Sequence, residues 1–201
     1  VIVSDDGMQH YKLPRDIQIA VIDGERQLGN GYCLPAGPLR EKKERLDECD
    51  LIVVNGNYNQ QNQWYAMDLE GDTLVNLKTA EERPLVQFSE KNVHALTGIG
   101  NPKRFYSSLE QQGLQLTTHS YPDHYDFKAN DLLFNDDKTV IMTEKDAVKC
   151  KKLVTDNRKY WYLPVKAQLD DGFDQQFLNH MESLYNRKSA QPRRSRKIHL
   201  E

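Results

Sequence analysis

The chain has 201 residues, of which 38% are hydrophobic and 28% are charged, and its formal net charge is −3. This composition is typical of a soluble globular protein, and no stretch approaches the roughly 20 apolar residues that a membrane-spanning helix needs. The odd number and wide spacing of Cys33, Cys49 and Cys150 argue against a disulfide framework and against a zinc site, so we expect a reducing compartment.

Short apolar runs that each stop at a polar or glycine-containing turn recur along the chain. They are VIVSDDG, IQIAVIDGER, LIVVNGN, VHALTGIGNP and TVIMTEKD, and segments of helical character such as PLREKKERLDECD and PKRFYSSLEQQG lie between many of them. Strands that alternate with helices pair in parallel. The sequence therefore predicts an α/β fold, with a mostly parallel sheet flanked by helices and a site at the edge where its strands end.

Residues 58–90 differ from this pattern. They begin rich in Asn and Gln and continue as two short strand-like pieces joined by Glu70-Gly71-Asp72, which predicts a small antiparallel hairpin inserted into the sheet. Further on, RKYWYLPVKAQL predicts an edge strand, and DQQFLNHMESLYN predicts a terminal amphipathic helix. The expected apolar side of that helix consists of Phe177, Leu178, Met181 and Leu184.

The last segment, residues 186–201, carries six Lys or Arg and one Glu. With so little apolar content it is expected to be a basic disordered tail beyond a domain at residues 1–185. Such a tail is either a solvated end or an electrostatic contact with anionic lipid or nucleic acid.

Four residues after the first apolar run form the first candidate site. Asp5 and Asp6 would stand at a strand tip, where carboxylates can hold Mg²⁺ directly or through its waters. Gln9 and His10 could then contact phosphate or order the loop. The simpler interpretation is a strand followed by an Asp-Gly turn.

The glycine- and proline-rich loop GNGYCLPAGPLRE is the second candidate, because it delivers Arg40 and Glu41 to the start of a predicted helix. An arginine there can bind phosphate oxygens through two parallel hydrogen bonds. A glutamate there can serve a metal or can simply complement the helix dipole.

Two further candidates lie in YPDHYDF and in TVIMTEKDAVK. In the first, Asp123 and His124 could provide a general base for a hydroxyl group, although a solvated loop histidine is the common alternative. In the second, Thr143 and Asp146 have the spacing of a helix N-cap, which we prefer to a contact of Lys145 and Asp146 with a nucleotide. The phosphate-binding pattern G-x-x-x-x-G-K-[ST] occurs nowhere in the chain.

In order along residues 1–185, the motifs SDDGMQHYKLPRDIQIAVIDGERQLGNGYCLPAGPLRE, VVNG, ALTGIGNPKRFYSSLEQQG, YPDHYDF and MTEKDAVKC, followed by WYLPV, closely resemble those of one family. That family is the tetraacyldisaccharide 4′-kinases, the lipid A 4′-kinases of Gram-negative bacteria. Its full chain is longer by an N-terminal half that holds the phosphate-binding P-loop. The resemblance implies a P-loop NTPase-like fold and identifies this chain as the C-terminal part alone, which explains why it begins inside a predicted strand.

The resemblance also implies the reaction and its participants. The ATP γ-phosphate is transferred, with Mg²⁺, to the 4′-hydroxyl of the lipid A disaccharide 1-phosphate precursor at the cytoplasmic face of the inner membrane, and no nucleic acid is expected. Asp5 and Asp6 would hold Mg²⁺, next to the polar pair Gln9 and His10.

By the same resemblance, Arg40 would contact phosphate and Glu41 the metal. His124, next to Asp123, would pair with an acidic base from the missing half. The cradle for the phosphates is missing, so we expect this fragment to be soluble and inactive alone. An accessory binding module derived from the kinase is the alternative, and a metal-dependent hydrolase that uses Asp5, Asp6 and His124 is a weaker one.

Overall fold

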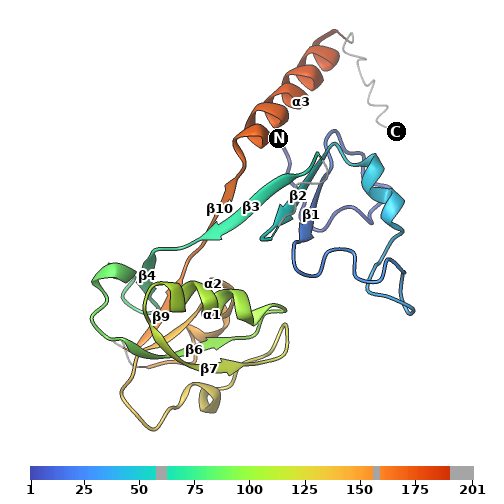
Figure 1. Cartoon of the computed structure of the whole chain (residues 1–201). Coiled ribbons are helices and arrows are strands. Elements are labelled where there is room, and N and C mark those ends of the chain that lie inside the picture. Colours follow the sequence, from blue (N-terminus) through green and yellow to red (C-terminus); the bar gives the residue numbers. More distant parts are fainter. Residues whose placement is uncertain (58–62, 156–158, 191–201) are drawn as a thin grey trace, which may run out of the picture. The chain divides into compact units, whose positions relative to one another are not determined.

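The computed structural model describes residues 1–57, 63–155 and 159–190, which fold as two compact units (Figure 1). Unit 1 comprises residues 1–69 together with the chain from residue 167 onward, and unit 2 comprises residues 70–166. The sequence predicts one domain over residues 1–185, and within that span the structure distinguishes these two units. The physical reason is that the segment between the two parts of unit 1 is long enough to build a hydrophobic core of its own.

Unit 1 is built on a four-stranded sheet with the strand order β1-β2-β3-β10. Its strands are β1 (Ile19–Asp23), β2 (Leu51–Asn55), β3 (Tyr65–Glu70) and β10 (Lys166–Leu169). The first three run parallel, with Ile19 opposite Leu51 and Val53 opposite Tyr65. The small core of this unit contains Leu51, Val53 and Phe173, and the loops that precede β1 and β2 carry the candidate residues of the N-terminal part.

The apolar run Val1-Ile2-Val3 is not a strand, so that prediction is wrong. All three side chains are at least 89% exposed, and the chain up to Gln18 consists of turns and irregular backbone. A strand is stable only where a neighbour pairs with its N–H and C=O groups, and none of the described residues does so here. The helix predicted over residues 38–50 is likewise reduced to a 3₁₀ segment, η1 (Lys43–Glu48).

Unit 2 is built on a six-stranded sheet with the strand order β5-β4-β9-β8-β6-β7. The parallel part consists of β6 (Asn92–Thr97), β7 (Gln115–Ser120), β8 (Val140–Thr143) and β9 (Tyr160–Leu163). The antiparallel part adds β4 (Thr73–Asn76) and β5 (Glu82–Pro84), and the short η2 (Leu85–Gln87) follows. Alternate residues of these strands enter two separate cores.

Helices cover the two faces of this sheet. One core packs Val93, Ala95 and Ile141 against helix α1 (Pro102–Gln111) through Phe105 and Leu109. The core on the opposite face lies against α2 (Glu144–Cys150) and η3 (Ala129–Leu132), and it includes Leu96, Val140, Met142, Ala147 and Leu132. The predicted α/β architecture, with mostly parallel strands flanked by helices, is therefore confirmed.

The predicted hairpin is wrong in its pairing. The pieces on either side of Glu70-Gly71-Asp72 are β3 and β4, which belong to different sheets, and the antiparallel hairpin in this region is formed by β4 and β5 instead. Residues 58–62 of the predicted insertion lie outside the described residues. The predicted edge strand RKYWYLPVKAQL is also two strands: β9 lies between β4 and β8, and β10 pairs in the other sheet, because Pro164 lacks the N–H that would continue a ladder.

The predicted terminal helix is confirmed as α3 (Asp171–Ala190), and three of the four residues on its expected apolar side are partly buried. Phe177 packs against the core of unit 1, and Met181 and Leu184 are partly buried, whereas Leu178 is 55% exposed. Phe173, which precedes the predicted segment, is buried. Residues 186–190, expected to be disordered, continue this helix, and Lys188 Nζ lies 2.5 Å from Asp16 Oδ2. Residues 191–201 lie outside the described part of the chain.

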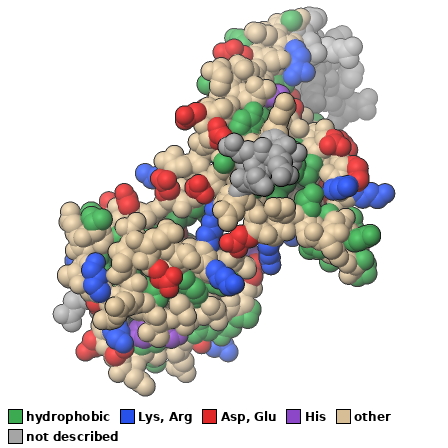
Figure 2. Space-filling model, viewed as in Figure 1, with side chains coloured by type: hydrophobic (Ala, Val, Ile, Leu, Met, Phe, Trp, Pro, Cys, Tyr) green, Lys and Arg blue, Asp and Glu red, His purple; other side chains and the backbone are tan. Residues whose placement is uncertain are grey.

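Basic and acidic side chains are interspersed over the face drawn in Figure 2. Within the described ranges, no helix combines the length and the apolar character that crossing a membrane requires.

Candidate functional site

Arg40 and Asp6 come together in unit 1, 34 residues apart in sequence. Arg40 Nη1 lies 3.2 Å from Asp6 Oδ2, and both side chains are largely exposed. Asp6 has a φ of 49°, so the chain turns here in the left-handed region that Asp tolerates better than most residues. The Asp-Gly turn that the sequence offered as the simpler interpretation is therefore present, and it carries the carboxylate to an arginine.

The neighbouring predicted residues, Asp5, Gln9 and His10, are exposed on the same loop. The His10 amide donates to the Gly7 carbonyl at 3.0 Å, and the His10 carbonyl accepts from Arg15 Nη2 at 2.6 Å. These bonds order the backbone of the loop and leave the imidazole at the surface.

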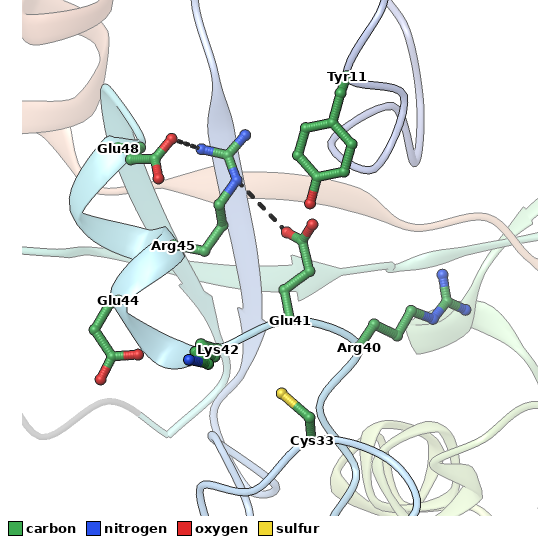
Figure 3. A pocket seen from close by; sticks show the side chains of 8 residues that line it. All are labelled: Tyr11, Cys33, Arg40, Glu41, Lys42, Glu44, Arg45 and Glu48. Carbon is green, nitrogen blue, oxygen red and sulfur yellow. Dashed lines mark hydrogen bonds and ion pairs between the residues drawn. The ribbon is translucent and has the colours of Figure 1, made fainter.

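Glu41 lines a pocket of about 450 Å³ in unit 1 (Figure 3). The other lining residues are Tyr11, Cys33, Arg40, Lys42, Glu44, Arg45 and Glu48. Glu41 Oε2 lies 3.6 Å from Arg45 Nε, and Tyr11 directs its hydroxyl toward the same carboxylate, whereas Arg40 extends away from this pair. Glu41 Oε1 is buried and finds no hydrogen-bond partner among the described residues. A buried oxygen without a partner can accept a bond from a ligand.

Arg45 organises this pocket, and the sequence analysis missed it. Its guanidinium forms ion pairs with Glu41 and Glu48, donates to Gln18 Oε1 at 3.1 Å, and lies 5.9 Å from the centre of the Tyr11 ring. The spacing of four residues from Glu41 to Arg45 was the available signal, since such pairs share one helix face.

The carboxylates of unit 1 are compatible with a Mg²⁺ ion that is bound jointly by the protein and by the phosphate groups of a substrate. Among the described residues, no three His, Cys, Asp or Glu side chains are grouped so that they could hold a metal ion. Magnesium, however, is commonly bound by one or two carboxylates together with the phosphate oxygens of a substrate. Asp5 and Asp6 are adjacent exposed carboxylates and fit that role. Glu41 fits it as well, because its Oε1 has no hydrogen-bond partner among the described residues.

In unit 2, the order of the strands creates a switch point. From β6 the chain passes through α1 to β7, and it then returns to place β8 on the other side of β6. The carboxyl ends of two parallel strands whose connections diverge in this way are the usual place for a ligand in α/β sheets. Thr97 and Gly98 mark the end of β6, and Thr143 marks the end of β8.

Asp123 and His124 follow β7 at this same edge. Asp123 Oδ2 lies 3.8 Å from His124 Nε2, and Asp123 Oδ1 accepts the His124 amide at 3.0 Å. Lys145 Nζ donates to that same oxygen at 3.1 Å, and this hydrogen bond is the main reason why the pKa of Asp123 is lowered. His124 has a φ of 61° and a largely exposed ring. An ionised carboxylate therefore stands beside an accessible imidazole.

The predicted N-cap is confirmed. Thr143 Oγ1 accepts the Asp146 amide at 3.3 Å at the start of α2. Asp146 itself is fully buried, and its Oδ2 accepts from Thr97 Oγ1 at 3.0 Å, the Gly98 amide at 2.9 Å and Thr143 Oγ1 at 2.7 Å. The aspartate thus joins the first turn of α2 to the end of β6.

The predicted site residues consequently fall into two groups, one in each unit. Asp5, Asp6, Gln9, His10, Arg40 and Glu41 belong to unit 1, and Asp123 and His124 belong to unit 2. The structure pairs Arg40 with Asp6 and Asp123 with His124, whereas Glu41 is paired with Arg45. The pairs Asp123–His124 and Glu41–Arg45 each join positions that are close in the sequence. The pair Arg40–Asp6 joins positions 34 residues apart, so sequence spacing could not reveal it.

Comparison with known proteins gives one consistent match. Residues 1–182 match the family model for tetraacyldisaccharide-1-P 4′-kinase. The tetraacyldisaccharide 4′-kinase of Legionella pneumophila (strain Lens) is 51% identical over 183 residues, which are 90% of this chain and 54% of the relative. The relative of that name from Nitrosococcus oceani is 45% identical over 188 residues, covering 94% and 54% of the two chains.

Among solved structures, the chain resembles an "apo" form of LpxK from Aquifex aeolicus in complex with ATP, with a TM-score of 0.64 and 27% identity. The match covers 88% of this chain and 55% of that one, so the chain spans about half the length of the relatives that it matches. The matched residues include all eight predicted site residues. The chain belongs to the tetraacyldisaccharide-1-P 4′-kinase family.

Proposed function

We propose that the chain is the C-terminal part of a kinase that transfers the γ-phosphate of ATP to the 4′-hydroxyl of tetraacyldisaccharide 1-phosphate, a precursor of lipid A. The observation that carries this proposal is the 51% identity to a tetraacyldisaccharide 4′-kinase over a span that includes every candidate site residue. The ATP in the similar LpxK structure supports the choice of nucleotide.

In this proposal, unit 1 supplies charge to the phosphate groups. Asp5, Asp6 and Glu41 would hold Mg²⁺, which when bound neutralises the charge on the transferring phosphate. Arg40 would bind phosphate oxygens, with Gln9 and His10 beside it. The 3.2 Å contact between Arg40 and Asp6 supports these assignments, because it brings a phosphate-binding side chain next to a metal-binding one.

Unit 2 would act on the acceptor. His124, with its exposed imidazole, would assist removal of the proton from the 4′-hydroxyl, either by accepting it or by orienting the carboxylate that does so. Asp123 would fix the histidine through the backbone bond and the nearby ring nitrogen. Phosphoryl transfer depends mainly on positioning and charge, so these tasks are the ones that a protein must provide.

The phosphate cradle would come from the part of the kinase that this chain does not match. The chain covers 54% of its Legionella relative, and the P-loop pattern is absent from its 201 residues. Loss of the cradle removes most of the stabilisation on which phosphoryl transfer depends. We therefore propose that the chain alone is inactive and that the complete kinase acts peripherally at the cytoplasmic face of the inner membrane, where its acylated acceptor would reside.

A transfer assay tests the proposal. The chain is incubated with labelled ATP, Mg²⁺ and the disaccharide 1-phosphate, alone and with the unmatched N-terminal half of the Legionella kinase added. We expect transfer only in the mixture. Transfer by the chain alone would contradict the need for an external cradle, and a well-folded mixture without transfer would favour an accessory binding module.

A further inference from the structure

Lys145 connects the switch point of unit 2 to the Asp123–His124 pair, and the proposed mechanism leaves it without a role. It occupies the first turn of α2, 22 residues beyond Asp123 in the sequence, and its Nζ lies 3.1 Å from Asp123 Oδ1. From the sequence we considered a nucleotide contact for Lys145 and Asp146 and preferred an N-cap made by Thr143 and Asp146, which assigns no partner to Lys145. The structure offers a different partner, a carboxylate next to the candidate catalytic histidine.

The backbone that carries Lys145 is firmly held. Its neighbour Asp146 is fully buried and accepts three hydrogen bonds, from Thr97, Gly98 and Thr143. These bonds tie the start of α2 to the ends of β6 and β8, which belong to the core of the parallel sheet. Lys145 therefore projects from one of the most constrained points of unit 2.

The loop that carries His124 is held on either side of the histidine, since the Tyr125 amide donates to the Pro122 carbonyl at 3.1 Å and Lys149 Nζ donates to the Tyr125 carbonyl at 3.0 Å. Asp123 and His124 themselves are exposed, and His124 adopts a φ of 61°, a left-handed conformation that is unfavourable for a residue other than glycine. A single atom, Asp123 Oδ1, receives both the His124 amide and the Lys145 ammonium. The lysine thus holds the oxygen that in turn holds the backbone of the histidine.

We propose that Lys145 is a positioning residue for the proposed phosphoryl transfer: it anchors Asp123 to α2 and, through Asp123, fixes the backbone conformation of His124. This inference rests on the proposed function. The lowered pKa of Asp123 supports it, since the carboxyl group stays ionised and can accept both bonds at once. The side chains of Lys145 and Asp123 are 46% and 47% exposed, so their ion pair adds little to the stability of the fold. Its role in this proposal is to set the position of the Asp123 carboxylate.

The first test uses the 201-residue chain and needs no kinase activity. Backbone chemical shifts and amide exchange of His124 are compared by NMR in the wild type, Lys145→Met, Lys145→Arg and the control Lys152→Met, which removes the same charge from an exposed position after α2. We expect the signals of residues 123–125 to shift and the His124 amide to exchange faster in Lys145→Met alone. Unchanged His124 signals in Lys145→Met would overturn the proposal.

The second test uses the mixture with the N-terminal half. We expect Lys145→Met to lower kcat at least about tenfold with KM within about twofold of the wild type, because misplacement of a catalytic group affects the chemical step. Lys145→Arg should recover most of the rate, and Lys152→Met should match the wild type. A raised KM with kcat preserved would instead show that Lys145 binds substrate directly, which contradicts a positioning role.

A double-mutant cycle distinguishes action through Asp123 from independent action. If Lys145 works through Asp123, Lys145→Met in an Asp123→Asn background should cost little further activity, whereas two independent effects would multiply. If the wild-type mixture shows no transfer at all, the proposed function fails, and the NMR comparison still decides whether Lys145 fixes His124.

Discussion

Replacement of Asp146 by Ala should destabilise unit 2 severely. The buried Oδ2 accepts three hydrogen bonds, from the Gly98 amide and the hydroxyls of Thr97 and Thr143. Each donor left buried without a partner costs about 1–3 kcal/mol, and the two hydroxyls can partly recover by rotating to other acceptors, so we expect a loss of about 3–5 kcal/mol. That is a large fraction of the roughly 5–15 kcal/mol that stabilises a typical domain.

Urea unfolding, followed by the fluorescence of the buried Trp161, measures this loss. With a slope of about 2 kcal/mol per M, the midpoint of the Asp146→Ala variant should fall by roughly 2 M. The exposed Asp126→Ala variant is the matched control and should unfold within about 0.5 kcal/mol of the wild type. A loss below about 1 kcal/mol for Asp146→Ala would refute the role of this carboxylate in joining α2 to β6.

Three further predictions concern other parts of the two units. Burial, and to a lesser extent the neighbouring His94, lowers the pKa of His119 in the folded chain. Below about pH 6.5 the unfolded chain therefore binds more protons than the folded chain, and stability falls as the pH falls. The urea midpoint of the wild type should decrease from about pH 8 to about pH 5.5, and that of His119→Gln should decrease less steeply. Arg45→Met should lower the stability of unit 1 by about 2–3 kcal/mol in calorimetry, because it leaves the partly buried Glu41 without its cation. If Arg45→Lys is as unstable as Arg45→Met, the contact of Arg45 with the Tyr11 ring matters more than its charge. Leu109→Ala, at a fully buried position of α1, should cost about 2–5 kcal/mol in urea unfolding, and a cost near zero would contradict the packing described.

Local pattern predicted most of the strands, because each apolar run in this chain is short and is followed by a turn. The runs that became β1, β2, β6 and β8 were found in this way, and so was the cap at Thr143. The failure at residues 1–3 has a physical reason: β-branched residues favour a strand only where a neighbouring strand is present, and sequence pattern contains no information about that neighbour.

Pairing across long distances was not predictable. The turn at Glu70-Gly71-Asp72 has the same composition whether the next strand folds back on β3 or joins another sheet, as β4 does. The contact between Lys145 and Asp123 depends on the order of β6, β7 and β8 in the sheet, which spacing alone does not reveal. The residues of the candidate site could therefore be named from motifs, whereas the partners that hold them required the fold.

The most direct test of the account is the rate of phosphate transfer by His124→Ala, measured in the mixture of this chain with the N-terminal half of the Legionella kinase. The account predicts transfer by the wild-type mixture and a loss of at least about 100-fold in kcat for His124→Ala, because general acid–base groups typically contribute that much. A His124→Ala mixture that transfers phosphate at the wild-type rate would contradict the role assigned to unit 2.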